Sequence, residues 1–384
     1  MKIILKKLRK IFSILLKTKF IFEKPQQTEI LIFDNTNSDV IKDTLINKSF
    51  QVLYIRFEQL NIYCLFKALL MKKNIKRTLF QIYLINYIKL CRPKIIISVL
   101  DNDPFLYNLK DSFPNIRIIL IQNGLRNFED DIYDKSKVHA VIKKPKNNKY
   151  KVDYIFTIND YFSQKYKKFF NCETKSIGFF RNNNFFYKPQ KIEKDTLCFI
   201  SQYNNIYKEK YNQELPDEKI LKFLNFYAFK KKKKLKILER YYGPSLDFCR
   251  KELKYNNWKI YFQKKNNNLT DYSSYTEAAN SEVIVNVDST LGYELLSRGK
   301  KVAFFSIRNW GAKFYKFGYP KATPDTGTFW TNNFDENKFE NILNYLFSIT
   351  DEHFLIENEK LINDIVLFDK KNIIFKEKIE KFLK

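Results

Sequence analysis

The sequence has few of the residues that commonly hold metals or act as nucleophiles. It contains two histidines, His139 and His353, and five scattered cysteines with no CxxC pair. Two histidines are too few to favour a catalytic triad or a histidine-rich metal site. An odd number of dispersed cysteines supports neither a disulfide framework nor a zinc site. The composition therefore indicates a protein of a reducing, cytoplasmic compartment.

Long apolar runs and glycine are also scarce. No apolar run approaches the roughly 18 residues of a membrane-spanning helix, so we expect no such helix. Eight glycines occur in the whole chain. Those in short motifs, such as Gly124 and Gly292, therefore mark positions where the backbone needs room or freedom.

Negative charge is the third deficit. Lys and Arg number 69 and Asp and Glu number 42, which gives a formal net charge of +27. Because Lys, Asn, Ile, Phe and Tyr are all abundant, we attribute part of this excess to compositional bias. The remainder predicts an anionic partner: nucleotide phosphates, acidic lipid headgroups or nucleic acid.

The N-terminal segment 1–25 is strongly basic. It holds eight Lys or Arg against one Glu, and its apolar residues recur at helical spacing. No small-residue cleavage site follows, so we do not expect a signal peptide. Two interpretations stay open. The segment is either an amphipathic helix on an anionic membrane surface or a helix packed on the first domain with a solvated basic face.

Chain length and strand-helix alternation predict two α/β domains. A chain of 384 residues exceeds one comfortable core. Continuously apolar strands between amphipathic segments are typical of parallel sheets covered on both faces. We expect strands at 29–33, 51–55, 94–100, 116–122, 154–158, 196–201, 236–239, 259–262, 282–287 and 302–306. The predicted parts are the segment 1–25, two doubly wound domains at 26–180 and 190–335 that face a cleft, and C-terminal helices at 336–384.

The most informative stretch is 286–302, which reads NVDSTLGYELLSRGKKV. It predicts a strand end, a polar turn, a helix of about ten residues and a second strand. Ser289 and Thr290 stand at the helix start, where a hydroxyl caps a backbone N–H and free N–H groups attract an anion. Glu294 follows one turn later, roughly 6 Å along the axis. A phosphate held at the turn would leave Glu294 within reach of a ribose hydroxyl, so the pattern favours a nucleotide site.

Three pieces of the sequence together resemble one enzyme family. They are Asp288–Glu294 with the trailing Gly299–Val302, Leu100–Asp103, and Ile121–Arg126. With them the chain resembles bacterial surface-carbohydrate biosynthesis proteins, of lipopolysaccharide or capsule, that are glycosyltransferases of the GT-B fold. The resemblance covers residues 28 to 335 and is most specific at Asp288–Glu294. It implies two Rossmann-like domains, 26–180 for the acceptor and 190–335 for the nucleotide sugar.

The resemblance also implies a reaction. A sugar would pass from a nucleotide-activated donor to a surface polysaccharide or a lipid-linked saccharide, without a metal and without a cofactor beyond the nucleotide-sugar co-substrate. The enzyme would work at the cytoplasmic side, peripheral to the inner membrane. A single phosphate at one helix start favours a CMP-linked acidic sugar such as Kdo. A pyrophosphate donor would need further basic residues, for which Arg240 and Lys300 are available.

Eight residues of the second domain are predicted to bind the donor. Glycosyl transfer builds negative charge on the departing phosphate, and positioned dipoles neutralise it. The predicted residues are Ser289, Thr290, Leu291, Gly292, Glu294, Ser201, Gln202 and Tyr203. The alternative is an ordinary capped helix in which Glu294 complements the helix dipole.

Six residues at two strand ends of the first domain are predicted to serve the acceptor. Asp101 and Asp103 follow one strand, and a carboxylate there can take the proton of an acceptor hydroxyl. The next strand end would orient the sugar, and its arginine would pair with an acidic sugar or phosphate; these residues are Gln122, Asn123, Gly124 and Arg126. The alternatives are an N-cap role for Asp103 and a plain polar turn at 122–124.

Three other functions compete with sugar transfer, and one of them is that of a non-catalytic scaffold with a GT-B-like fold. A polyol-phosphate transferase of the same fold would use a CDP-activated donor, but such enzymes depend on histidines, which are nearly absent here. A nucleic-acid-binding protein would suit the charge and the aromatic residues. We find neither an RNP-type nor a helix-turn-helix signature, so we expect no nucleic-acid partner.

Overall fold

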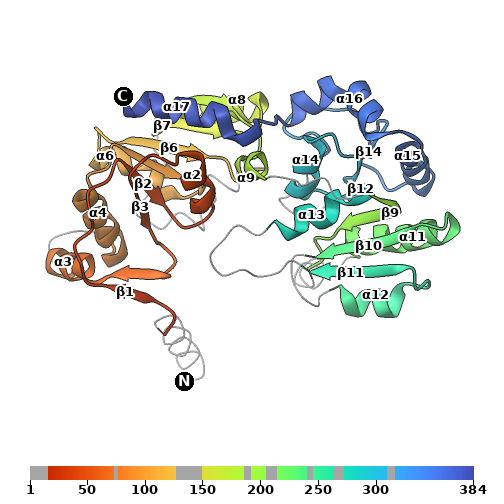
Figure 1. Ribbon diagram of the computed structural model, residues 1–384, viewed down its shortest axis with the longest axis horizontal. Coiled ribbons are helices and arrows are strands. Elements are labelled where there is room, and N and C mark those ends of the chain that lie inside the picture. The colour runs from red at the N-terminus through yellow and green to blue at the C-terminus, as the bar shows by residue number, and fades with distance from the viewer. Residues whose placement is uncertain are drawn as a thin grey trace. The chain divides into compact units, whose positions relative to one another are not determined.

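The computed structural model describes residues 16–72, 77–126, 149–185, 192–204, 214–239, 245–262, 272–308 and 316–384. Its contacts divide the chain into two compact units, drawn in Figure 1. Unit 1 comprises Met1–Thr157, Ser163–Arg181 and Lys371–Lys384, and unit 2 comprises Ile158–Phe162 and Asn182–Lys370. The predicted C-terminal helices, 336–384, are thus divided between the two units.

Unit 1 is built on a parallel sheet of six strands in the order β3-β2-β5-β6-β7-β8. The strands are β2 Ile30–Phe33, β3 Phe50–Leu53, β5 Ile95–Ser98, β6 Arg117–Ile121, β7 Tyr150–Thr157 and β8 Phe170–Ser176. Every residue of β2 and β5 is buried. Burial of successive residues means that both faces of the sheet are covered.

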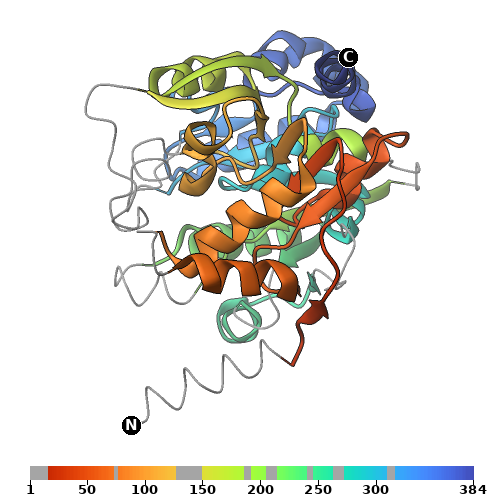
Figure 2. The same ribbon diagram turned by 90° about the vertical axis from the view of Figure 1, so that its left-hand side faces the viewer.

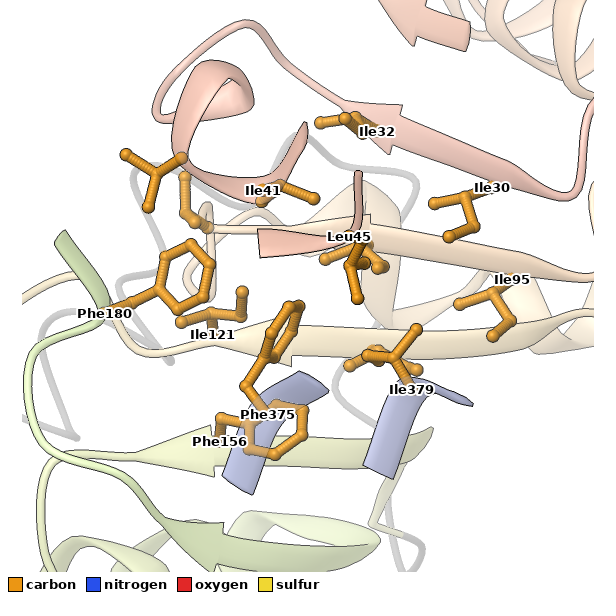
Figure 3. Close-up of a cluster of buried hydrophobic side chains, with 14 of the residues drawn as sticks. Ile30, Ile32, Ile41, Leu45, Ile95, Ile121, Phe156, Phe180, Phe375 and Ile379 are labelled. Carbon is orange, nitrogen blue, oxygen red and sulfur yellow. The ribbon is translucent and has the colours of Figure 1, made fainter. Parts of the chain in front are cut away.

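The core of unit 1 joins the sheet to helices from distant parts of the chain (Figure 3). Helix α2 (Ser38–Thr44) contributes Ile41. The last helix, α17 (Ile373–Leu383), contributes Phe375 and Ile379. The ring of Phe375 lies 5.1 Å from that of Phe156 and 4.8 Å from that of Phe180, centroid to centroid. Residues of α17, late in the sequence, therefore pack in the same core as residues of β2 and α2.

The other elements of unit 1 lie around this core. Helix α3 (Ile62–Lys72) packs beside α4 (Leu79–Cys91), as Figure 1 and Figure 2 both show. A capping box of Thr78 and Gln81 starts α4. Short helices α5 (Pro104–Tyr107) and α6 (Leu109–Ser112) follow β5. Strands β1 (Lys19–Ile21) and β4 (Gln59–Asn61) form a separate two-stranded parallel ribbon. Helices α8 (Asp160–Phe169) and α9 (Phe180–Asn184) each have residues in both units.

Unit 2 repeats the architecture with a second parallel sheet of six strands, in the order β11-β10-β9-β12-β13-β14. Its strands are β9 Glu193–Ile200, β10 Lys234–Glu239, β11 Trp258–Phe262, β12 Ser281–Asn286, β13 Val302–Phe305 and β14 Trp330–Thr331. Its helices are α11 Pro216–Lys230, α12 Leu246–Glu252, α13 Ser273–Ala279, α14 Thr290–Leu296, α15 Glu336–Ser348 and α16 Asp351–Ile365, followed by the turn η1 Lys370–Asn372. The chain then continues into α17 of unit 1.

The predicted doubly wound α/β class is confirmed. Each of the ten predicted strands is present, within four residues at either end. The structure adds β1, β4, β8 and β14, which are short or carry polar residues and so lack the continuous apolar signal. Within the described residues, no helix has the length and apolar character needed to cross a membrane.

Candidate functional site

The predicted donor turn lies in unit 2, between β12 and α14. Ser289 is the N-cap residue of α14, with φ −69° and ψ 139°. Its hydroxyl makes no capping hydrogen bond, so the predicted contact with a backbone N–H is wrong. The helix has seven residues, which is shorter than the predicted ten. Ser289, Thr290 and Leu291 are all half-buried, and the helix start is therefore reachable from solvent.

A fully buried asparagine, Asn286, fixes this turn. Its Oδ1 accepts a hydrogen bond from the backbone N–H of Ser289 at 3.1 Å, and its Nδ2 donates to the Ser289 carbonyl at 3.1 Å. Gly292 packs on the same amide, since a Cβ at Gly292 would lie 2.3 Å from Asn286 Nδ2. The glycine is thus required by Asn286. The predicted reason was close approach of the backbone to a ligand, which stays a prediction.

Glu294 lies one turn after Thr290 and is 8 % exposed. It neighbours Arg298, whose pKa is lowered by burial, with the charges of Tyr275 and Glu294 opposing that shift. Arg298 Nε donates to Asn182 Oδ1 at 2.6 Å. The end of α14 is thereby tied to the segment that enters unit 2. A ribose contact by Glu294 stays a prediction.

A buried arginine, Arg308, links the carboxyl ends of three strands of unit 2. Its Nε donates to Asp288 Oδ2 at 2.8 Å, and its Nη2 lies 3.7 Å from Asp217 Oδ2 and 3.4 Å from Gln202 Oε1. Asp217 Oδ1 also accepts from the backbone N–H of Gln202 at 2.6 Å and from Ser201 Oγ at 3.4 Å. The predicted donor residues Ser201 and Gln202 therefore share one polar network with Asp288, the residue before the donor turn.

Two further groups complete this edge of the sheet. The hydroxyl of Tyr203 donates to Glu218 Oε1 at 3.0 Å, which ties the third predicted residue of this loop to the start of α11. Glu239 ends β10 and is 4 % exposed. Burial, assisted by the charge of Asp217, raises the pKa of Glu239 to about 7. Within the described chain, Glu239 Oε2 has no hydrogen-bond partner.

In unit 1, Asp101 is fully buried and hydrogen-bonded to its own chain. Its Oδ1 accepts from the backbone N–H of Asn123 at 3.0 Å, and its Oδ2 accepts from Arg126 Nε at 2.7 Å. Arg126 Nη2 and the hydroxyl of Tyr166 donate to the same carboxylate. A carboxylate that is enclosed by donors in this way holds those donor groups in position. These contacts favour a structural role over the proton transfer predicted for Asp101.

The remaining predicted acceptor residues lie around this ion pair. The guanidinium of Arg126 is paired with Asp101 and its side chain is 12 % exposed, so it is not held ready for an external anion. Gln122 is buried and donates through Nε2 to the carbonyl of Gly124 at 2.8 Å. Asn123 is exposed. Its side chain is therefore the best placed of the four to meet a sugar.

Asp103 differs from Asp101 because it is half-buried. It is the N-cap of α5 and accepts from the backbone N–H of Phe105 at 2.9 Å. Burial and the charge of Asp34 raise the pKa of Asp103, although the Phe105 contact opposes the shift. Asp34 ends β2 in the left-handed region, with φ 79°, and its Oδ2 lies 3.0 Å from Arg56 Nε. The carboxylate of Asp34 therefore lies near enough for its charge to act on Asp103.

Sequence reasoning missed several residues of these edges. Asn286 and Asp288 stand inside the quoted motif, but their contacts could not be read from spacing. Asp34 had a usable signal, because it directly follows a buried strand as Asp101 does. Arg308 and Asp217 lie far apart in the sequence, and nothing local relates them. The sequence also offers Glu129, Asp130 and Asp131 as weaker base candidates and 241–245 as further donor contacts. Residues 129–131 and 241–244 lie outside the described residues, as do His139 and Arg240.

A family described as "putative O-antigen biosynthesis protein" matches residues 119–383, about two thirds of the chain. The chain belongs to this family. The predicted recognition as a surface-carbohydrate biosynthesis protein is thereby confirmed. No curated protein matches the sequence.

Solved structures similar to this family member include both transferases and epimerases. A UDP-N-acetylglucosamine 2-epimerase matches with a TM-score of 0.54 and 12 % identity over 93 % of this chain and 96 % of its own. A spinosyn forosaminyltransferase matches with a TM-score of 0.50 and 9 % identity over 93 % and 100 %. Against a chain of the GtfA/B complex the TM-score is 0.44, and the present chain spans 60 % of that chain's length. At such identities the likeness shows the fold, which is GT-B as predicted.

In the part of the chain that the structure describes, no three His, Cys, Asp or Glu side chains are grouped so as to hold a metal ion. A reaction without a metal and without a cofactor stays a prediction.

Proposed function

We propose that this protein is a glycosyltransferase of O-antigen or related surface-carbohydrate biosynthesis. The observation that supports this most directly is that a chain of an O-antigen biosynthesis family has the GT-B fold. The donor would be a nucleotide-activated sugar, and the acceptor a surface polysaccharide or a lipid-linked saccharide. The acceptor hydroxyl would attack the anomeric carbon while the bond from that carbon to the phosphate oxygen breaks.

The donor phosphate would bind at the start of α14. Charge grows on the phosphate oxygen as the bond breaks, and hydrogen-bond donors fixed in advance stabilise it. Ser289 and Thr290 would supply hydroxyls, and Leu291 and Gly292 backbone N–H groups. Asn286 would hold the turn in shape. Glu294 would contact the ribose, and Ser201, Gln202 and Tyr203 would form the neighbouring wall of the site.

On the acceptor side, we assign proton removal to Asp103. A half-buried carboxylate with a raised pKa is a stronger base than an exposed one and is still reachable by a substrate. Asp101, with Arg126 and the turn of Gln122 and Gly124, would support the exposed Asn123. This refines the prediction, which gave Asp101 and Asp103 the same role.

A CMP-linked acidic sugar such as Kdo remains our proposal for the donor. One short helix start offers few N–H groups, which suits a single phosphate better than a pyrophosphate. Arg308, which contacts Asp288 just before the turn, is already paired with Asp288 and Asp217. Lys300, considered for a pyrophosphate, pairs with Asp351 at 3.0 Å. The protein would act at the cytoplasmic side of the inner membrane.

A nucleotide panel tests the donor site. Melting temperature would be measured with CMP, CDP, UDP and GDP, since a ligand present at 100 times its Kd stabilises the folded state by about 2.7 kcal/mol. We expect CMP to raise the melting temperature. We expect Ser289→Ala and Glu294→Gln to weaken CMP binding about tenfold or more, because each removes one polar contact of the bound nucleotide.

Thr350→Ala is the matched control. Thr350 is also a helix N-cap in unit 2, at the start of α16, and its loss should leave the nucleotide shift intact. A panel in which no nucleotide stabilises the protein would contradict the proposal. Conversion of UDP-N-acetylglucosamine without any acceptor would instead indicate an epimerase, and stabilisation by CDP with transfer of a polyol phosphate would indicate the other rival.

A further inference from the structure

Helix α3 of unit 1 is apolar on its buried side and on its exposed side. Nine of its eleven residues, IYCLFKALLMK, are apolar, and its two charges are Lys67 and Lys72. Cys64 and Ala68 are fully buried against the rest of the unit. A helix that is apolar all round is normally covered all round. Here one side is covered by the protein's own core and the other side is exposed.

The exposed side carries large side chains at helical spacing. Phe66 is 61 % exposed, Leu69 52 %, Leu70 64 % and Met71 38 %. Positions 66, 69 and 70 are related by steps of three and four residues, so they lie on one face. Apolar residues scattered singly over a surface need no explanation, whereas a contiguous group indicates a binding surface.

The elements that contact α3 have the same character. β1 and β4 both pack near it. Leu16 and Phe22 are each 72 % exposed, Phe20 41 %, and Phe57, before β4, 41 %. Eight of the fifteen exposed large apolar residues in the described chain therefore fall within 16–24, 56–57 and α3. We call the exposed side chains of 16–24, 56–57 and α3 the α3 surface.

Charge identifies the partner. Segments 16–24 and 56–72 carry six cations, Lys17, Lys19, Lys24, Arg56, Lys67 and Lys72, against two anions, Glu23 and Glu58. Arg56 is paired with Asp34, which leaves five cations against two anions. A second copy of this chain would bring the same cations to the interface, and the two would repel. An anionic bilayer offers acyl chains for the apolar residues and negative headgroups for the lysines.

We propose that the α3 surface docks unit 1 on an anionic lipid membrane. Phe66, Leu69 and Leu70 would enter the boundary between headgroups and acyl chains. Lys17, Lys19 and Lys24, all exposed, would contact the headgroups. All of these residues lie within the described chain, and the proposal does not depend on the proposed reaction.

Sedimentation with vesicles tests the proposal. The full-length protein would be mixed with vesicles of phosphatidylglycerol and phosphatidylcholine, and with vesicles of phosphatidylcholine alone. We expect binding to the anionic vesicles that weakens as salt screens the headgroups. The affinity of the double variant Phe66→Gln, Leu70→Gln for the anionic vesicles should be lower by about tenfold or more, because its apolar contacts are lost.

Ile356→Gln is the matched control. Ile356 is 66 % exposed on α16 of unit 2, and its substitution should leave vesicle binding within about twofold, in keeping with its place outside the α3 surface. Melting temperatures would confirm that all variants fold. Wild-type binding retained in the double variant would overturn the proposal, as would equal binding to neutral vesicles. A wild-type dimer that the double variant dissociates would also overturn it, in favour of a second copy.

Discussion

The carboxyl edges of the two sheets use their polar residues differently. In unit 1, Arg126 and Tyr166 both donate to Asp101, which is closed off from solvent. In unit 2, the start of α14 is half-buried, and the Ser289 hydroxyl makes no capping bond. The buried carboxylate of the first edge is satisfied within the protein, while the Ser289 hydroxyl of the second is not used as a cap. Polar residues at the end of a parallel strand therefore do not by themselves mark a binding site.

The difference arises from which atoms hold each turn. At the unit 2 turn, the amide of Asn286 bonds to the backbone of Ser289 and leaves the hydroxyl out. At the unit 1 turn, the carboxylate of Asp101 takes the backbone N–H of Asn123 and also the guanidinium of Arg126. A buried carboxylate that stays charged needs a cation or other donors beside it, and the cation Arg126 is then no longer available to a substrate.

The largest expected effect is that of Asp101→Asn. The amide cannot neutralise Arg126, and a buried ion pair that loses one partner costs about 3–5 kcal/mol of unfolding free energy. Urea denaturation would measure the loss. The double variant Asp101→Asn, Arg126→Gln should recover part of it, because the unpaired cation is gone.

Asp325→Asn is the control for this pair. Asp325 faces Lys316 at 2.8 Å, and both side chains are about half exposed, so no measurable change is expected. If Asp101→Asn abolished sugar transfer with unchanged stability, Asp101 would be a base after all, and the contrast between the two edges would fail.

Much of the fold could be predicted because its strands are continuously apolar. Ile30–Phe33 and Ile95–Ser98 are buried along their whole length, which is a local signal that parallel sheets produce. The return of α17 to the core of unit 1 could not be predicted. Phe375 meets Phe156 and Phe180 through contacts between residues that are about 200 positions apart, and no short pattern encodes such a pairing.

The position of the donor turn in the fold could be predicted, but the contacts of its side chains could not. Ser289 and Thr290 begin a helix after a buried strand, as their spacing indicated. The ion pair between Asp101 and Arg126 could not be predicted, although both residues were predicted for the acceptor side. An ion pair depends on the directions of the two side chains, which spacing does not give. Arg308, which joins Asp288 to Asp217, follows its strand without any motif.

A second test concerns Glu239, a buried carboxyl of the unit 2 edge. Its pKa is raised from 4.5 to about 7, so the folded state holds the proton more tightly than the unfolded state. The contribution of the Glu239 proton to the free energy of unfolding is therefore complete below about pH 4.5 and is lost as pH rises through about 7. By pH 8.5, Glu239→Gln should be more stable than the wild type by about 3 kcal/mol, with little difference at pH 4.5.

Denaturation of both proteins across this pH range would measure the difference. Ser245→Ala is the control, because Ser245 contacts Glu239 through its backbone and its substitution removes no titrating group. A difference between Glu239→Gln and the wild type that does not grow with pH would show that the charged form of Glu239 is as well stabilised as the neutral form, and the contrast with the Asp101 carboxylate of unit 1 would fail.

The smallest expected effect compares two N-cap hydroxyls of unit 2. Thr350 Oγ accepts from the backbone N–H of His353 at 3.2 Å, so Thr350→Ala should cost about 1 kcal/mol of unfolding free energy. The Ser289 hydroxyl has no such bond, and Ser289→Ala should cost less than about 0.5 kcal/mol. Urea denaturation of the two variants without ligand measures both values. Equal losses would make Ser289 an ordinary cap and remove the reason for placing a phosphate there. A small loss for Ser289→Ala, together with a lost CMP shift, would mean that the hydroxyl serves the ligand and not the helix.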